Sequence, residues 1–372
     1  MKVLIVGAGV AGLALAATLI RDGHTLHVVE ARPEDDERYG AGLLLTPNAV
    51  QALDTVLADP DWRGALRHVH QVTYADGTDV PLFAIPCEGD WPAPFATVRH
   101  HRLRSLLLAR APGLVQHDNS VTAIRSDTGQ VTFASGARDR FDLIVGADGV
   151  HSTTRALLFE GSAAAIAAPF EGFRCVTRNA ADIDEPRQLI GNGATLLLYP
   201  LPDDELYVGA GPVAGALMRL GSDPAGAIRK AFEGFGPSAV AALSNLPERN
   251  AFIPTRYWTV RQQPWHRDRC ILIGDAAHAS PPTLAQGAAM ALEDAIVLSD
   301  TLRSHGRVDE ALRSYERRRR PRVERVQAES VQRLEANLPV SSHAARVRNQ
   351  IARRVGRQTL EGTWKWLAHE RP

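Results

Sequence analysis

The chain has 372 residues, with 42 basic and 42 acidic side chains and therefore a formal net charge of zero. This length is too great for one compact core and predicts two domains, and a hydrophobic content of 45% is ordinary for a globular protein. Zero net charge excludes a general electrostatic attraction to nucleic acid or to an anionic membrane.

Cysteine and hydropathy patterns narrow the class further. Cys87, Cys175 and Cys270 lie far apart and match no metal-binding or redox spacing, so we expect no metal site and no disulfide. Beyond the N-terminal segment, no run approaches the ~20 apolar residues that a membrane-spanning helix needs. We therefore expect a cytoplasmic protein without nucleic-acid or membrane partners.

The N-terminal segment reads as a strand, a glycine turn and a helix. Val3–Val6 is a short apolar run typical of a buried parallel strand, and Leu13–Ile20 is rich in alanine and leucine. Gly7, Gly9 and Gly12 between them have the spacing of a dinucleotide fingerprint: a tight turn, close approach to a pyrophosphate, and close helix–strand packing. The start of the helix would then face the phosphates.

A second strand, Leu26–Glu30, ends in a carboxylate eighteen residues after Gly12. Glu30 is placed to accept hydrogen bonds from ribose hydroxyls, and its charge disfavours a 2′-phosphate, so this site should hold FAD or NAD rather than NADP. The alternative is a glycine turn without a ligand. A similar run at 209–215 has one residue too many and a proline in the turn, so we interpret it as a strand entering a loop.

Two further segments place an aspartate after a strand. Leu143–Val145 leads to Asp148, which is followed by Gly149 and then Ser152 and Arg155; this carboxylate either faces a ligand or caps the turn. Ile271–Ile273 leads to Asp275 at the carboxyl end of the strand, where open α/β sheets bind ligands. His278 follows this turn, and we favour a structural role for it.

The middle of the chain predicts an antiparallel sheet, punctuated at Pro200, Pro202 and Pro254. Its side chains Tyr199, Tyr207 and Arg174 either pack in the core or, if they point inward, contact a substrate. The expected strands are 69–75, 80–84, 173–176, 195–199, 206–209 and 252–259. In the arginine-rich tail, glutamates at pairing distances predict a solvated helical face, with Pro321 and Pro339 dividing the helices.

In this order, the three glycine and aspartate segments resemble those of the single-component, FAD-dependent aromatic hydroxylases of the para-hydroxybenzoate hydroxylase family. Further matches are Gly40–Leu43 leading to Pro47–Ala49, and Tyr315-Glu316 with Arg319–Arg322. The resemblance covers residue 1 to about residue 330. It implies an α/β fold with a discontinuous Rossmann-like FAD-binding domain (1–75, 97–160 and 266–330), an inserted, mostly antiparallel substrate domain (76–96 and 161–265) and C-terminal helices (331–372).

The resemblance also implies site residues. Pro282, whose carbonyl would lie near the oxygen-reacting face of the flavin, and Tyr207 are the catalytic candidates. The implied FAD contacts are Gly7, Gly9, Gly12, Glu30, Ala31, Arg32, Arg99, His100, Val121, Asp148, Gly149, Asp275, Ala285, Gln286, Gly287, Ala288 and Ala289.

Two positions depart from the family pattern. Ala285 stands where the family has glycine; its methyl group calls for a negative φ and predicts a shifted loop. His100 stands where the family has arginine, so that either His100 reaches the FAD, or Arg99 replaces it, or the basic cluster is solvated.

The function implied by the resemblance is hydroxylation of a small aromatic or heteroaromatic ring. NADH or NADPH would reduce FAD, and dioxygen would form a hydroperoxide at flavin C4a that transfers its distal oxygen. We expect a monomer or homodimer. The alternatives are epoxidation, Baeyer–Villiger oxidation or double-bond reduction on the same flavin core, and an FAD-binding accessory protein without turnover.

Overall fold

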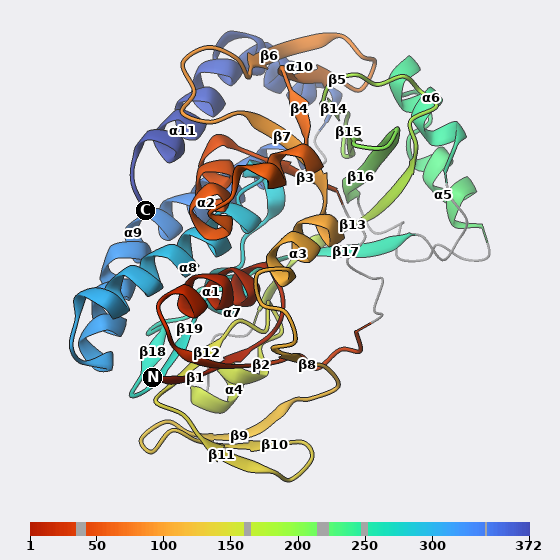
Figure 1. Cartoon of the computed structure of the whole chain (residues 1–372). Coiled ribbons are helices and arrows are strands. Elements are labelled where there is room, and N and C mark those ends of the chain that lie inside the picture. Colours follow the sequence, from red (N-terminus) through yellow and green to blue (C-terminus); the bar gives the residue numbers. More distant parts are fainter. Residues whose placement is uncertain (35–41, 160–164, 214–222, 247–251, 339–340) are drawn as a thin grey trace.

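The computed structural model describes residues 1–34, 42–159, 165–213, 223–246, 252–338 and 341–372, which form a mixed α/β fold (Figure 1). Gly40 and Ala41 of the segment that precedes Pro47–Ala49 lie outside the described residues. None of the described helices combines the length and the apolar character needed to span a bilayer.

The first sheet has six strands and carries the predicted glycine and aspartate segments. All neighbouring strands are parallel except the edge pair β18·β19. Val6 pairs with Gly146, and Gly146 pairs with Leu272, so three carboxyl ends lie side by side. In spatial order the strands are β18 (His266–Arg267), β19 (Cys270–Leu272), β12 (Leu143–Gly146), β1 (Lys2–Val6), β2 (Thr25–Val29) and β8 (Val115–Gln116).

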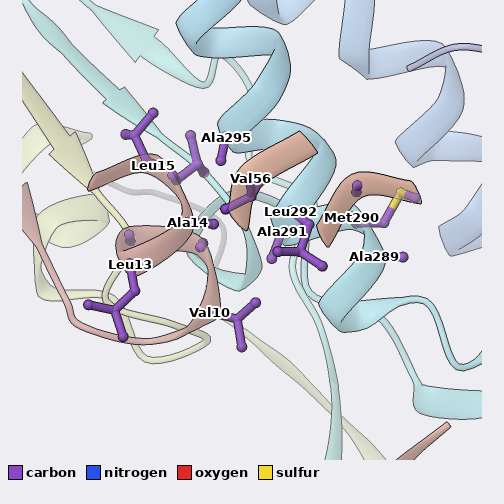
Figure 2. Packing of buried hydrophobic residues seen from close by; sticks show 14 of the residues in the cluster. Val10, Leu13, Ala14, Leu15, Val56, Ala289, Met290, Ala291, Leu292 and Ala295 are labelled. Atoms are coloured by element: carbon purple, nitrogen blue, oxygen red, sulfur yellow. The ribbon is translucent and has the colours of Figure 1, made fainter. Parts of the chain in front are cut away.

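Helices cover this sheet and bury both of its faces. The alanine-rich α1 packs against α8; Ala14, Ala291 and Ala295 belong to this core, and such small side chains let the two helices approach closely (Figure 2). The helices around this core are α1 (Val10–Arg21), α2 (Pro47–Leu57), α3 (His100–Leu108), α4 (Thr153–Leu158), α7 (Asp275–His278), α8 (Gly287–Ser304) and α9 (Val308–Ala336).

Two small sheets and two short 3₁₀ turns complete this part of the fold. They are β3 (Gly42–Leu45), β7 (Phe95–Arg99) and β4 (Arg67–Val69); β11 (Arg138–Arg140), β10 (Gln130–Phe133) and β9 (Val121–Arg125); and the turns η2 (Pro60–Ala65) and η5 (Pro282–Leu284).

The seven-stranded sheet is antiparallel except at the β14·β5 pair. Helices α5 (Pro224–Ala231) and α6 (Pro237–Ser244) cover its outer face (Figure 1). The order is β17 (Ile253–Thr259), β13 (Ile166–Arg178), β16 (Glu205–Val213), β15 (Thr195–Leu201), β14 (Arg187–Ile190), β5 (Gln71–Asp76) and β6 (Pro81–Pro86).

Alternation along these strands separates the two faces of the sheet. Phe173, Leu196 and Val208 belong to the core under α5 and α6, whereas their neighbours Arg174, Thr195 and Tyr207 point the other way, because successive side chains of a strand face opposite sides. Arg174, Tyr199 and Tyr207 therefore point away from the core under α5 and α6; whether they contact a substrate stays a prediction.

Three prolines behave differently from the sequence expectation. Pro200 and Pro254 lie inside strands rather than in turns. Pro200 lies beyond the last residue of β15 that pairs with β14, and Pro254 is on the edge strand β17, so each has a neighbouring strand on one side only, where strands tolerate proline. Pro321 lies inside α9 instead of dividing two helices. Pro339 is outside the described residues.

The predicted domain boundaries remain a prediction, but two placements bear on them. Strand β5, assigned mostly to the FAD-binding part, pairs with β14 and β6 in the seven-stranded sheet. The C-terminal segment packs back on the core through α10 (Ser342–Ile351), a π-helical turn, η6 (Ala352–Gly356), and α11 (Arg357–His369).

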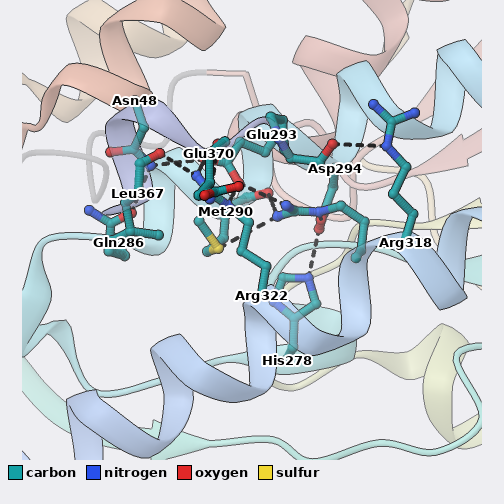
Figure 3. Close-up of polar contacts among 12 residues, drawn as sticks. Asn48, His278, Gln286, Met290, Glu293, Asp294, Arg318, Arg322, Leu367 and Glu370 are labelled. Carbon is teal, nitrogen blue, oxygen red and sulfur yellow. Dashed lines mark hydrogen bonds and ion pairs between the residues drawn. The ribbon is translucent and has the colours of Figure 1, made fainter. Parts of the chain in front are cut away.

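A buried ion-pair network joins α8 to α9 (Figure 3). Arg319 donates from Nε to Asp294 (2.8 Å) and from an Nη atom to Glu293 (2.7 Å), and Arg322 donates to both oxygens of Glu293 (2.8 Å each). The second oxygen of Asp294 accepts from His278 Nε2 (2.7 Å) and from the Gly274 N–H (2.8 Å). Two carboxylates thus face two guanidinium groups, which is the pairing that buried charges require.

The network predicts unequal roles for two adjacent arginines. Arg319→Met should lower the free energy of unfolding by about 3–5 kcal/mol, because it leaves buried carboxylates without their shared cation. Arg318 pairs with Asp300 at the surface (2.5 Å), so Arg318→Met, the matched control, should cost about 0–1 kcal/mol. Urea unfolding followed by circular dichroism measures both, and equal losses would contradict this account of the network.

Candidate functional site

The fingerprint turn is tightly packed at two glycines and open at the third. Gly7 has φ +107°, and a Cβ there would lie 2.4 Å from the Ala147 carbonyl oxygen; a Cβ on Gly12 would lie 2.0 Å from the Gly7 oxygen. A Cβ on Gly9, the residue before α1, would meet no atom within 4 Å. The first N–H groups of α1 therefore open onto free space, as an anion site requires.

Glu30 lies at the end of β2 and is bonded to the same turn. One carboxylate oxygen accepts from the Ala8 N–H (2.8 Å) and the other from the Arg32 N–H (3.1 Å). A carboxylate has about four acceptor positions, so both oxygens retain capacity for hydroxyl donors. Ala31 and Arg32 follow Glu30 on the exposed side, and Val121 begins β9 with a buried side chain.

Asp148 caps α4. Its carboxylate accepts from the Ser152 hydroxyl (2.5 Å) and from the N–H (2.8 Å) and hydroxyl (3.0 Å) of Thr154, while Ser152 accepts from the Arg155 N–H (2.9 Å). The capping alternative is thus observed, and a ligand contact by Asp148 stays a prediction. Gly149 follows with φ +79°.

Asp275 follows β19 at the same edge of the sheet. Its side chain is accessible and lines a recess together with His278, Ser280 and Gly287. Desolvation there raises the pKa of the carboxyl group, with His278 and Arg174 acting against the rise. Arg155 donates to the Ala276 carbonyl (2.8 Å) and to the Val150 carbonyl (2.8 Å), and so joins the second segment to the third.

The start of α8 faces the same recess. The first helical bond runs from the Met290 N–H to the Gln286 carbonyl (2.9 Å), which leaves the N–H groups of Gly287, Ala288 and Ala289 outside the helical ladder. The Gln286 side chain points elsewhere, to Asn48 (2.9 Å) and Thr46 (2.8 Å). The side chain of Ala289 is in the core, so only its backbone is available.

Ala285 corrects a sequence expectation. Its φ is +56° and ψ is +34°, in the left-handed region, rather than the negative φ that its methyl group favours. The loop therefore keeps a glycine-like backbone at an alanine, which costs about 1–2 kcal/mol of local strain.

The basic residues near residue 100 differ in their contacts and in their charge. Arg99 pairs through Nε with Glu205 (2.6 Å), and a second contact makes the pair bidentate. Burial lowers the pKa of His100 to about 4, with further lowering by Arg174 and Arg104, so this imidazole is neutral at ordinary pH. Arg104, which sequence reasoning did not single out, donates to the Ala8 carbonyl of the fingerprint turn (3.1 Å). Its position one helical turn after His100, on the same face of α3, was the available signal.

A cavity adjoins η5 and the seven-stranded sheet. Pro282 and Ala285 line one side of it, and Tyr199 and Tyr257 line another. Trp364 of α11 lines a third side and donates from its indole to the Leu284 carbonyl (3.1 Å). Sequence reasoning gave no role to this tryptophan, since only tertiary packing places it here.

Tyr207 does not line this cavity. Its ring lies 5.7 Å from that of Tyr199, its cross-strand partner. A Cβ added at Gly42 would lie only 2.6 Å from the Cβ of Tyr207. The tyrosine, which is on β16, therefore packs directly against β3. A catalytic role for Tyr207 stays a prediction.

Together these features fit FAD. The open start of α1, the carboxylate of Glu30, the exposed Asp275 and the free N-terminus of α8 follow one another along one edge of the parallel sheet. The charges of Arg174, Arg104 and Arg32 all lower the pKa of His100, and Arg104 donates to the Ala8 carbonyl of the fingerprint turn, so positive charge lies close to this edge.

Comparison with known proteins also indicates an FAD-binding protein. The model of the family described as "FAD binding domain" matches residues 1–170 and 244–330, more than half of the chain. The chain belongs to this family. It is 30% identical to a probable 2-heptyl-3-hydroxy-4(1H)-quinolone synthase of Rhodococcus erythropolis, over 95% of this chain and 92% of that protein. It is also 30% identical to a 3-hydroxybenzoate 6-hydroxylase of Polaromonas naphthalenivorans (88% and 85%).

Solved structures show the same fold. The structure of Klebsiella pneumoniae HpxO complexed with FAD and uric acid superposes with a TM-score of 0.87 at 22% identity, covering 99% of this chain and 96% of that one. The chain is therefore a FAD-dependent monooxygenase of the aromatic hydroxylase family, as the resemblance of its motifs predicted.

The open space at Gly9 gives a first prediction for this site. Gly9→Ala should weaken FAD binding at least about tenfold, because the methyl group would occupy the space of the pyrophosphate, while loss of a favourable N-cap residue costs about 1 kcal/mol of stability. Flavin fluorescence titration of the apoprotein measures the affinity. Gly64→Ala, at another glycine without neighbours, is the control, and unchanged affinity for Gly9→Ala would contradict the placement.

The backbone strain at Ala285 gives a second prediction for this site. Ala285→Gly should raise the free energy of unfolding by about 1 kcal/mol, since glycine adopts positive φ without a Cβ clash. Ala227→Gly, inside α5, should instead lower it by about 0.5–1 kcal/mol. Paired urea titrations decide; a loss of stability at both positions would show that Ala285 is unstrained.

Proposed function

We propose that this monooxygenase hydroxylates a small aromatic or heteroaromatic ring with NADH or NADPH as the reductant. The observation that carries the proposal is the cavity bounded by Pro282–Ala285, next to the N-terminus of α8, and by the seven-stranded sheet. Aromatic and aliphatic side chains line most of it, with a few neutral polar groups among them, as is usual for sites that bind small apolar ligands. The named relatives act on or produce hydroxylated aromatic rings.

The proposed contacts follow the sheet edge. The N–H groups at the start of α1 would bind the pyrophosphate, Glu30 the ribose hydroxyls and Asp275 the ribityl chain. The N–H groups of Gly287, Ala288 and Ala289 would meet the flavin ring where negative charge collects on reduction, which the positive end of α8 stabilises.

FAD supplies electron transfer and activation of dioxygen when bound; the reaction inserts one oxygen atom into the ring and releases the other as water, with NAD(P)H oxidised. The chain supplies position and exclusion of water. The Pro282 carbonyl and the cavity wall would hold the ring beside the flavin, and Trp364, nearly fully buried, closes the far side.

Compartment and assembly are also proposed. The three cysteines of the chain are buried and unpaired, as expected in the reducing cytoplasm. We infer a monomer or homodimer, which size-exclusion chromatography with light scattering tests.

The test of the proposed function uses the purified, FAD-saturated enzyme with NADH and, separately, NADPH. Phenols, aminobenzoates, quinolones and purines are screened for stimulated NAD(P)H oxidation, and products are analysed by mass for gain of one oxygen atom, with labelled dioxygen as its source. We expect coupled hydroxylation of at least one ring. A yellow protein that consumes no NAD(P)H with any ring would instead indicate an accessory role, and peroxide as the sole product would contradict hydroxylation.

A further inference from the structure

The cavity beside Pro282 has an uncharged lining among the residues that the structure describes. It combines aromatic, aliphatic and neutral polar groups and contains no Lys, Arg, His, Asp or Glu. The lining residues are Leu44, Tyr74, Gln188, Thr195, Leu197, Tyr199, Gly211, Tyr257, Pro282, Thr283, Leu284, Ala285, Leu334, Asn337 and Trp364.

The tyrosines do not add charge. Burial raises the pKa of Tyr257 to about 12 and shifts the pKa of Tyr74 and of Tyr199 well upward as well. All three are therefore neutral phenols under physiological conditions. A carboxylate placed among them would lose hydration and find no cation within the described lining to pair with, which is unfavourable.

Two guanidinium groups lie outside the described lining but act on its tyrosines. The charge of Arg174 acts on Tyr257, and that of Arg333 acts on Tyr74. The charge of Arg174 also acts on Asp275 and His100, and the charge of Glu329 acts on Arg333. Arg99 is paired with Glu205.

One polar group in the lining has no protein partner. The Thr195 hydroxyl is buried, with the residue 3% exposed, and makes no hydrogen bond to any described residue. Gln188 is on the neighbouring strand β14 and lines the cavity on the same side of the sheet. Leaving a buried hydroxyl unsatisfied is costly, so a group in the cavity is expected to pair with it.

We propose that the substrate is an uncharged aromatic or heteroaromatic ring, without a carboxylate, whose polar substituent is hydrogen-bonded by Thr195 with Gln188 beside it. This proposal rests on the function proposed above and specifies the substrate class of the same site. It assigns Thr195 as a specificity-determining residue.

The test compares ring pairs that differ only in a carboxylate: 4-hydroxyquinoline with its 2-carboxylate, and phenol with 3-hydroxybenzoate. Dissociation constants for the FAD-bound enzyme come from the perturbation of flavin absorbance, and turnover from NAD(P)H oxidation with mass analysis. In each pair the neutral member should bind at least about tenfold more tightly.

Variants of Thr195 give a second, independent readout. Thr195→Val should weaken binding of the preferred ring about five- to tenfold and leave kcat nearly unchanged, whereas Thr195→Ser should retain binding. Without substrate, the Thr195→Val variant should have a melting temperature equal to or above that of the unmodified enzyme, because a buried unsatisfied hydroxyl is removed. A threonine with a purely structural role would instead give a lower melting temperature. Thr122→Val, on β9 and outside the lining, is the control.

Tighter binding of the carboxylates, lost in Arg174→Gln, would overturn the proposal and indicate an anion subsite. If the neutral rings bind preferentially but no product gains oxygen, the proposed function fails while the assignment of the cavity stands. If carboxylates are hydroxylated in preference, the function stands and this inference fails.

Discussion

The buried pairing of Glu293 and Asp294 with Arg319 and Arg322 is the interaction on which the geometry of this enzyme depends. Asp294 binds the Gly274 N–H, immediately before Asp275, and Glu293 accepts from Asn48 (2.9 Å), which also donates to Gln286 (2.9 Å). The network thereby fixes the turn after β19, the start of α2 and the N-terminus of α8 against one another. Burying these charges is expensive, so their contribution is to a defined arrangement rather than to stability alone.

The same requirement explains how α9 continues through Pro321. An internal proline costs about 3 kcal/mol, because one helical hydrogen bond is lost and the ring crowds the preceding turn. Arg319 and Arg322 flank that proline, and only a continuous helix presents both guanidinium groups to Glu293. Sequence reasoning expected a break at Pro321 since it weighed the local cost without the buried partners.

Local patterns predicted the cofactor edge, and long-range contacts decided the rest. Strand, glycine turn and helix at Gly7–Gly12 follow from spacing, and three strands ending in Gly or Asp segments were expected at one edge of a parallel sheet. The pairing of Asp294 with Arg319, 25 residues apart, has no local signature. Nor does the reach of Arg104 to the Ala8 carbonyl, since the segment around residue 100 drew attention to Arg99 and His100 instead. At Ala285 local preference gave the wrong backbone, because the surrounding loop imposes a positive φ.

The C-terminal helix connects this network to the cavity. Arg322, bound to Glu293, also donates to the Leu367 carbonyl (2.6 Å) and the Glu370 carbonyl (3.2 Å), at the end of α11 (Figure 3). Three residues before Leu367, Trp364 binds the Leu284 carbonyl within η5. The loop that contains Pro282 and Ala285 is thus held from two directions, by Gln286 at the start of α8 and by Trp364 from α11. Because both contacts lead back to Glu293, the same buried carboxylate supports the wall of the cavity and the edge of the parallel sheet, so the proposed position of a ring against Thr195 would be fixed relative to Gly9 and Asp275.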